Sequence, residues 1–298
     1  MEHGRADVLL SPSPAQLPTL ATRYVGQLHF GPLGATIGLV LNTRVWPFNT
    51  LAARQALNYA IDRNKLIQLI GGPLTAQPTC QILPPGLPGY QPYCPYTLNP
   101  RPVGMWTAPN LAQAEHLVSV SGTRGAKVTV ITGAFGTKIP VQATGRYLVS
   151  VLDQLGYRAS LQVIPGGNGN AYNRRLYDSR RRMQVGWFGW YQDYPAPSDF
   201  ITPLLTCHSF LPGNPANLNA AEFCNHRIDA QVGQALALQV HNPSTAAALW
   251  AHIDHELVGQ APWVPVYNPR SLVMLSTRVG NYQFNPYWSF LIDQLWVH

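Results

Sequence analysis

The hydrophobic positions of this chain follow two periods, which divide it into predicted helices and strands. Over 51–70 apolar residues recur every three or four positions, which predicts one helix with Ala53 and Leu57 on its buried face. Arg54 and Arg63 fall on the opposite face, and we expect both to point to solvent. The same reasoning predicts further helices at 111–120, 140–155, 172–182, 230–239 and 244–258, and strands at 38–43, 127–132, 159–164, 185–190, 263–267 and 271–275.

The order of these elements predicts an α/β fold. A strand, a helix and a second strand lie within 127–164, at the spacing of a parallel βαβ unit. The next helix and strand extend this unit, so we expect a sheet with helices on its faces. The chain has 298 residues, of which 46% are hydrophobic, and this is enough for one large or two ordinary domains.

The four cysteines lie in pairs in two loops rich in proline and asparagine. Cys80 and Cys94 fall in the first loop, and Cys207 and Cys224 fall in the second. No two of them form a CxxC pair, so a zinc ribbon is not expected. We predict two loop-closing disulfides, Cys80–Cys94 and Cys207–Cys224, and these indicate an oxidising compartment.

Arginine carries most of the positive charge. The net charge is +7, and only 11% of the residues are charged. Neither a phosphate-binding glycine loop nor a nucleic-acid motif accompanies the densest cluster, so we interpret it as a solvated helix face and predict no nucleic-acid partner. This cluster contains Arg174, Arg175, Arg180, Arg181 and Arg182.

No catalytic constellation is found along the chain. Residues 166–169 are rich in glycine but lack the Lys-Ser/Thr of a phosphate loop, so we interpret them as a turn. His252, His255 and Glu256 stand in the order HxxHE, which matches neither zinc-protease motif, and we interpret them as a polar helix face. We therefore predict no enzymatic activity, no metal and no cofactor.

The residues from 187 to 194 combine aromatic rings with one carboxylate, Asp193. A strand is predicted to end at Trp190, and Pro195 and Pro197 are expected to stop regular structure. A carboxylate among aromatic faces can receive the ammonium group of a ligand. The alternative is a core strand that runs into a proline turn, with Asp193 capping the next segment. The residues alone leave both interpretations open.

The N-terminal residues conflict with an oxidising compartment. Residues 1–7 include two acidic residues and no apolar stretch, so no signal peptide is predicted, and no run of residues is apolar enough to predict a membrane span. Either the protein is cytosolic, or the complete protein continues upstream of Met1.

Several motifs stand in the order typical of one protein family. The motifs are Leu41-Asn42-Thr43, Pro47-Phe48-Asn49, the helix from Arg54 to Arg63, Leu83-Pro84-Pro85-Gly86, and the segments 147–157, 189–195 and 262–267. With these motifs the chain resembles the C-terminal half of the extracytoplasmic solute-binding proteins of ABC transporters for dipeptides and oligopeptides, known as family 5.

This resemblance implies a fold and a binding site. Family 5 proteins resemble type II periplasmic-binding proteins, in which two lobes close on a ligand like a Venus flytrap. By resemblance, Asp193 would pair with the α-ammonium group of a peptide. Trp190 and Tyr191 would line the adjacent wall, and Trp187 and Tyr194 complete the predicted aromatic site.

The resemblance also implies an organisation and partners. We expect residues 1–44 to end a first lobe and form the hinge, 45–265 to form the C-terminal ligand-binding lobe, and 266–298 to return to the first lobe. The complete protein would be an extracytoplasmic lipoprotein, with most of its first lobe before Met1, that passes a peptide or related solute to an ABC permease. The alternatives are the solute-sensing domain of a transcriptional regulator and a non-binding fragment of the same family.

Overall fold

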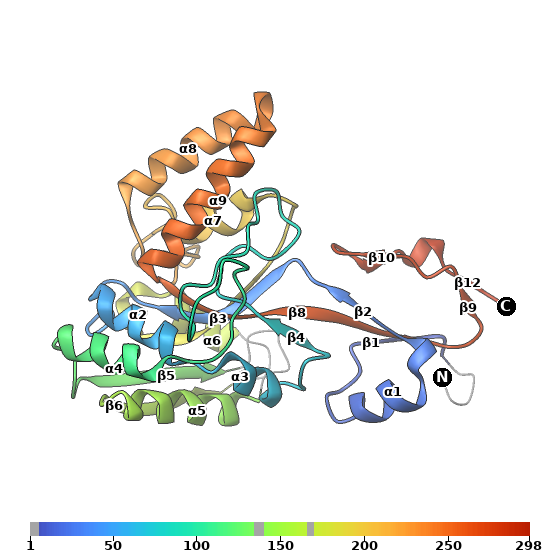
Figure 1. Cartoon of the computed structure of the whole chain (residues 1–298), viewed down its shortest axis with the longest axis horizontal. Helices are drawn as coiled ribbons and strands as arrows, with labels where there is room; N and C mark the ends of the chain where they lie inside the picture. The colour runs from blue at the N-terminus through green and yellow to red at the C-terminus, as the bar shows by residue number, and fades with distance from the viewer. Residues whose placement is uncertain (1–5, 134–139, 166–169) are drawn as a thin grey trace.

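An eight-stranded mixed sheet forms the framework of the protein, and two small two-stranded sheets, β10-β11 and β12-β9, lie near its C-terminus. The computed structural model describes residues 6–133, 140–165 and 170–298. The main sheet has the strand order β1-β8-β3-β7-β5-β6, and β2 and β4 also pair with β8. Figure 1 shows a large body covered by helices and a smaller extension that carries α1, β1, β2 and both termini. The predicted α/β architecture is confirmed, including the parallel pair β5 and β6.

The bounds of the elements are as follows. The helices are α1 (Leu17–Arg23), α2 (Leu51–Ala60), α3 (Arg63–Leu69), α4 (Leu111–Val120), α5 (Val141–Gln154), α6 (Asn170–Tyr177), α7 (Pro197–Leu205), α8 (His226–His241) and α9 (Pro243–Gln260). The strands are β1 (Val8–Leu10), β2 (Leu28–Pro32), β3 (Ala35–Leu41), β4 (Ala76–Pro78), β5 (Lys127–Gly133), β6 (Arg158–Ile164), β7 (Val185–Tyr191), β8 (Trp263–Leu275), β9 (Val279–Gly280), β10 (Phe284–Asn285), β11 (Ser289–Phe290) and β12 (Trp296–Val297).

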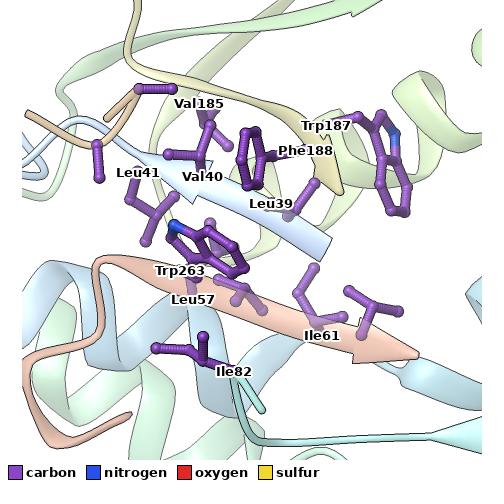
Figure 2. Packing of buried hydrophobic residues seen from close by; sticks show 14 of the residues in the cluster. Leu39, Val40, Leu41, Leu57, Ile61, Ile82, Val185, Trp187, Phe188 and Trp263 are labelled. Atoms are coloured by element: carbon purple, nitrogen blue, oxygen red, sulfur yellow. The ribbon is translucent and has the colours of Figure 1, made fainter. Parts of the chain in front are cut away.

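Strand β3 lies at the centre of the hydrophobic core. All seven of its residues are buried, and it pairs with β7 on one side and β8 on the other. Figure 2 shows the side chains of these strands packed together, and the rings of Phe188 and Trp263 meet edge to face with centroids 4.6 Å apart. Strand β8 passes close to Gly38, and a Cβ there would collide with the carbonyl oxygen of Val264. The assignment of 1–44 to a first lobe stays a prediction, although β3 is part of the body.

Strand β8 connects the body to the extension. It contains 13 residues, and it pairs with β3 near its start and with β1 and β2 towards its end. The prediction of two separate strands here is wrong. The reason is β4, whose Ala76 and Gln77 pair with Pro269 and Asn268 and so continue the ladder through the middle of β8.

The predicted helix over 51–70 is two helices. Helix α2 ends before Ile61, which has extended backbone angles (φ −69°, ψ 119°). Asp62 is also extended, and its carboxylate accepts a hydrogen bond from the backbone N–H of Lys65 at 2.9 Å. Asp62 is thus the N-cap of α3, and an N-cap residue has non-helical angles that interrupt a continuous helix.

The two arginines expected to face solvent are buried, so that prediction is also wrong. Arg54 is 6% exposed, and it donates hydrogen bonds to the carbonyl oxygens of Gln260 and Phe48. Arg63 is completely buried, and its Nε donates to the carbonyls of Thr79 at 2.8 Å and Pro265 at 2.9 Å. Burial lowers the pKa of Arg63 to about 9, so it stays charged at neutral pH. Carbonyl oxygens replace the lost water, and Arg63 thereby ties α3 to β8.

Both predicted disulfides are confirmed. Cys80–Cys94 closes the long loop before α4, and Cys207–Cys224 closes the loop between α7 and α8. No helix among the described residues is long and apolar enough to cross a lipid bilayer.

Two other boundaries differ from the prediction. Pro197 does not stop regular structure but begins α7, because proline fits the first turn of a helix, where its missing N–H is not needed. The arginine-rich helix ends at Tyr177, and Asp178 caps a separate 3-10 turn, η2 (Ser179–Arg181). The turn predicted at 166–169 lies outside the described residues.

A buried carboxylate joins α9 to the first disulfide loop. Asp254 is 1% exposed, and it accepts hydrogen bonds from the side-chain amide of Gln81 at 2.9 Å and from the backbone N–H of Ile82 at 3.2 Å. Burial raises the pKa of Asp254 from 3.8 to about 7, although these hydrogen bonds oppose the shift. Between these two pH values the folded protein holds a proton that the unfolded chain has released.

The free energy of unfolding is therefore expected to fall as the pH rises from about 4 to about 7, by up to about 1.4 kcal/mol per pH unit from this group. Asp254→Asn removes the titration and should flatten this part of the profile, which urea unfolding across the pH range measures. The exposed Asp293→Asn is the matched control. A slope in Asp254→Asn equal to that of the unaltered protein would contradict this role for Asp254.

Candidate functional site

Asp199 organises the loop that follows β7. This residue lies in the first turn of α7 and is buried. Its Oδ2 accepts hydrogen bonds from Nε1 of Trp190 at 3.2 Å and from the backbone N–H of Asp193 at 2.9 Å. Burial raises the pKa of the Asp199 carboxyl, and the two hydrogen bonds oppose that shift. The loop is thus held by a carboxylate that the sequence analysis did not single out.

The position of Asp193 rules out the capping role considered for it. The N-cap position of α7 belongs to Ala196 and has no side-chain hydrogen bond, so the capping role considered for Asp193 is wrong. Asp193 is exposed, and no hydrogen bond or ion pair joins its carboxylate to another described residue. Its backbone N–H is held by Asp199, and its side chain is exposed.

A cavity of about 640 Å³ lies beside this carboxylate. The end of β7 and the loop after it form one wall, and α7, the second disulfide loop and α8 form the others. Its lining residues include Trp190, Asp193 and Tyr194 on the first wall and Thr206, His208, Asp229, Val232 and Leu236 on the others. The volume lies in the range typical of sites for small ligands.

The cavity is negatively charged. Its acidic lining residues are Asp193, Asp199 and Asp229, and the described lining includes neither Lys nor Arg. The carboxylate of Asp229 accepts the backbone N–H of Cys207, at 3.0 Å to Oδ2, and so is already in use. The carboxylate of Asp199 accepts the hydrogen bonds from Trp190 and Asp193 described above. Asp193 is the acidic lining residue whose carboxylate has no hydrogen-bond partner among the described residues.

The structure brings together some of the predicted aromatic residues and separates others. Trp190 and Tyr194 line the cavity with Asp193, whereas Trp187 and Tyr191 do not. Side chains alternate along a strand, so Trp187 and Tyr191 point to the face of β7 opposite Trp190. Trp187 is completely buried in the core, and Tyr191 is exposed at the strand end. A contact of either residue with a solute stays a prediction.

Comparison with known proteins identifies the family. Residues 1–210 match the family described as Bacterial extracellular solute-binding proteins, family 5 Middle. The chain belongs to this family. Over 290 residues it is 25% identical to "Probable di/tripeptide-binding protein 5" of Pseudomonas aeruginosa (strain UCBPP-PA14). This match covers 96% of the present chain and 50% of that protein. Over 307 residues it is 26% identical to heme-binding protein A of Haemophilus influenzae, and this match covers 96% of the present chain and 49% of that protein.

Solved structures of family 5 proteins share this fold. DppA from Helicobacter pylori, in complex with the peptide STSA, matches with a TM-score of 0.76 at 20% identity, covering 99% of this chain and 53% of that one. HbpA2 from Haemophilus parasuis matches with a TM-score of 0.79 at 18% identity, and the match covers 100% of the present chain and 55% of HbpA2. The chain thus spans about half the length of these family 5 relatives. Membership in a family of solute-binding proteins agrees with the expectation that the chain is not an enzyme.

A group of possible metal ligands is explained by a disulfide. Among the described residues, Cys207, Cys224 and His226 bring ligand atoms within 4.8 Å of one another. The two sulfurs are bonded to each other, and a disulfide offers no thiolate to a metal. This group therefore supports no metal site.

Sequence reasoning missed the far wall of the cavity. Thr206, His208 and Asp229 lie on the second disulfide loop and α8, and their spacing from Asp193 forms no motif. Asp199 had a weak local signal, as an acidic residue in the first turn of a helix that begins with proline. The sequence analysis expected the prolines to stop regular structure and predicted no helix over 197–205, so this position of Asp199 carried no weight there.

Removing the carboxylate of Asp199 should loosen the loop. Asp199→Ala leaves the N–H groups of Trp190 and Asp193 without their acceptor, and we expect a loss of about 1–3 kcal/mol in the free energy of unfolding. Hydrogen exchange of the Asp193 amide should become faster, and mass spectrometry of peptides over 190–196 measures it. Asp293→Ala, at an exposed site in the extension, is the control. Unchanged exchange at 190–196 would show that Asp199 does not hold the loop.

Proposed function

We propose that this chain supplies one wall of the binding site of an extracytoplasmic protein that captures peptides, or related small solutes with an ammonium group. The observation that carries the proposal is the free carboxylate of Asp193 at a negatively charged cavity. An ammonium group is the natural partner of such a carboxylate. The rings of Trp190 and Tyr194 add apolar area and cation–π attraction for the same group.

The fixed loop supports binding at this position. Asp199 holds the backbone at Asp193, so less backbone entropy is lost when a ligand pairs with its carboxylate. Two relatives add support by name, since one is called a di/tripeptide-binding protein and the DppA structure holds the peptide STSA. Another is called a heme-binding protein, so the family name alone does not select a peptide.

In the complete protein, the solute would be enclosed between this lobe and a first lobe and delivered to ABC permease subunits at the membrane. The extension would belong to that first lobe, with residues 1–44 as its end and hinge and residues 266–298 as the chain that returns to it. Its C-terminal part exposes large apolar side chains, with Trp288 73% exposed and Ile292 70% exposed. Apolar surface of this kind is usually covered by another part of a protein or by a partner.

The test compares two ligands that differ only at the amino terminus. Trialanine with a free α-amine should bind the 298-residue chain more tightly than N-acetyl-trialanine, because only the former has an ammonium group for Asp193. Asp193→Asn should weaken trialanine binding about fivefold, corresponding to about 1 kcal/mol for an ion pair that one wall leaves partly solvated. The acetylated peptide should be unaffected. NMR titration measures both.

Asp293→Asn makes the same chemical change at an exposed site away from the cavity and should affect neither peptide. Equal losses for both peptides in Asp193→Asn would mean that the residue shapes the loop and does not recognise the amine. That result would reject the proposal.

A further inference from the structure

A second groove of the body carries the opposite charge. It has a volume of about 700 Å³ and lies along α6 and η2, and none of its lining residues lines the cavity at Asp193. Four positive charges and one negative charge line it, which leaves a net charge of +3. The sequence indicated a solvated helix face here, but the structure places these side chains around a concave surface. The charged lining residues are Arg174, Arg175, Arg180, Arg181 and Asp178.

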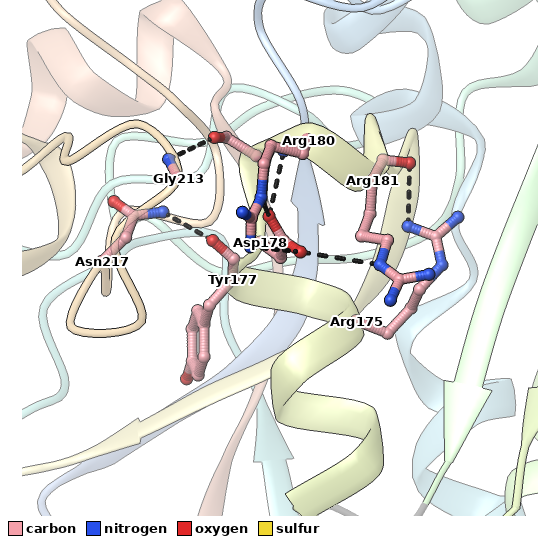
Figure 3. Close-up of polar contacts among 8 residues, drawn as sticks. Arg175, Tyr177, Asp178, Arg180, Arg181, Gly213 and Asn217 are labelled. Atoms are coloured by element: carbon pink, nitrogen blue, oxygen red, sulfur yellow. Dashed lines mark hydrogen bonds and ion pairs between the residues drawn. The ribbon is translucent and has the colours of Figure 1, made fainter.

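Most of these guanidinium groups are held in place by neighbouring groups. Figure 3 shows Asp178 between two of them, where Oδ1 accepts from Nε of Arg180 at 2.8 Å and Oδ2 lies 3.5 Å from Nε of Arg181. Nη1 of Arg175 donates to the carbonyl oxygen of Arg181 at 2.9 Å. Arg174 is exposed and forms no ion pair with any residue in the described ranges. Arginines oriented in advance lose less entropy when a ligand binds.

The opposite wall of the groove is anchored as well. It is the tip of the second disulfide loop, where the N–H of Gly213 donates to Oγ of Ser179 at 2.9 Å. The side-chain amide of Asn217 donates to the carbonyl of Tyr177, also at 2.9 Å. The disulfide Cys207–Cys224 closes the same loop at its base. The groove therefore has two walls that are fixed relative to each other.

We propose that this groove binds a small soluble anion that carries two or more phosphate groups. The planar guanidinium group matches the spacing of phosphate oxygens and can donate two parallel hydrogen bonds. A net charge of +3 in one groove calls for several negative charges in a compact ligand, and a single carboxylate supplies only one. The concave shape and the volume fit a soluble small molecule better than the plane of a membrane.

The test uses the 298-residue chain and inorganic tripolyphosphate, with isothermal titration calorimetry at an ionic strength of about 0.15 M, where the Debye length is about 8 Å. The double variant Arg174→Gln/Arg181→Gln should weaken binding by at least about tenfold, because it removes two charge-assisted contacts. Both side chains are exposed, and the Arg181 carbonyl that holds Arg175 is kept, so the variant should fold. Circular dichroism and the melting temperature check this.

The matched control is Arg101→Gln/Arg124→Gln, which removes the same net charge from exposed positions outside the groove. It should retain tripolyphosphate binding within about twofold, since distant charges on the surface are screened. Asp193→Asn should bind tripolyphosphate as the unaltered chain does, which separates this site from the proposed peptide site.

Three results would overturn the proposal. The first is no binding of tripolyphosphate by the unaltered chain. The second is an equal loss in the two double variants, which would indicate a response to net charge alone. The third is that the chain sediments with phosphatidic acid vesicles but does not bind tripolyphosphate. That result would mean that the arginines contact a lipid surface.

Discussion

The continuous pairing of β8 is the constraint on which both ends of the protein depend. This strand completes the core sheet beside β3 and then supplies the strand on which β1 and β2 assemble. The backbone N–H and C=O groups of a buried strand need partners along its whole length, and β4 provides them where the body ends. The position of the extension therefore follows from the packing of the body.

The body also fixes the loop that carries the candidate site. Strand β7 pairs with β3 along seven residues, and this pairing holds the end of β7 beside Asp199. Asp199 then accepts hydrogen bonds from Trp190 in β7 and from Asp193 in the loop that follows. Two neighbouring carboxylates then take different roles. Asp199 is buried and satisfied by two N–H donors, while Asp193 is exposed and has no polar partner for its carboxylate among the described residues. A buried charge without hydrogen bonds would be costly, which explains why the buried carboxylate is the structural one.

The second disulfide loop separates two cavities of opposite charge. His208 and Leu218 of this loop line the acidic cavity, and Gly213 lines the arginine groove. The loop is held by its disulfide, by the contact of Asp229 with the Cys207 N–H, and by the contact of Gly213 with Ser179. A segment fixed at several points can form a wall on each side, whereas a mobile loop would give neither cavity a defined shape.

The sequence by itself determined the features that depend on local chemistry. The period of apolar residues located β5, α5 and β6, and the paired cysteines identified both disulfides. Several motifs in order identified family 5, and the aromatic segment identified Asp193 as the candidate ligand group. These features depend on neighbouring residues, which a sequence pattern contains.

Only the tertiary structure decided the features that depend on distant partners. Arg63 is buried because the carbonyls of Thr79 and Pro265 surround it, although its helical position indicated an exposed residue. The middle of β8 is a strand because β4 pairs with it. The far wall of the acidic cavity and the groove around the arginines arise where the second disulfide loop returns to the body. Hydrogen bonds and burial between residues far apart in the chain set these outcomes, and the local pattern of hydrophobic residues carries no record of them.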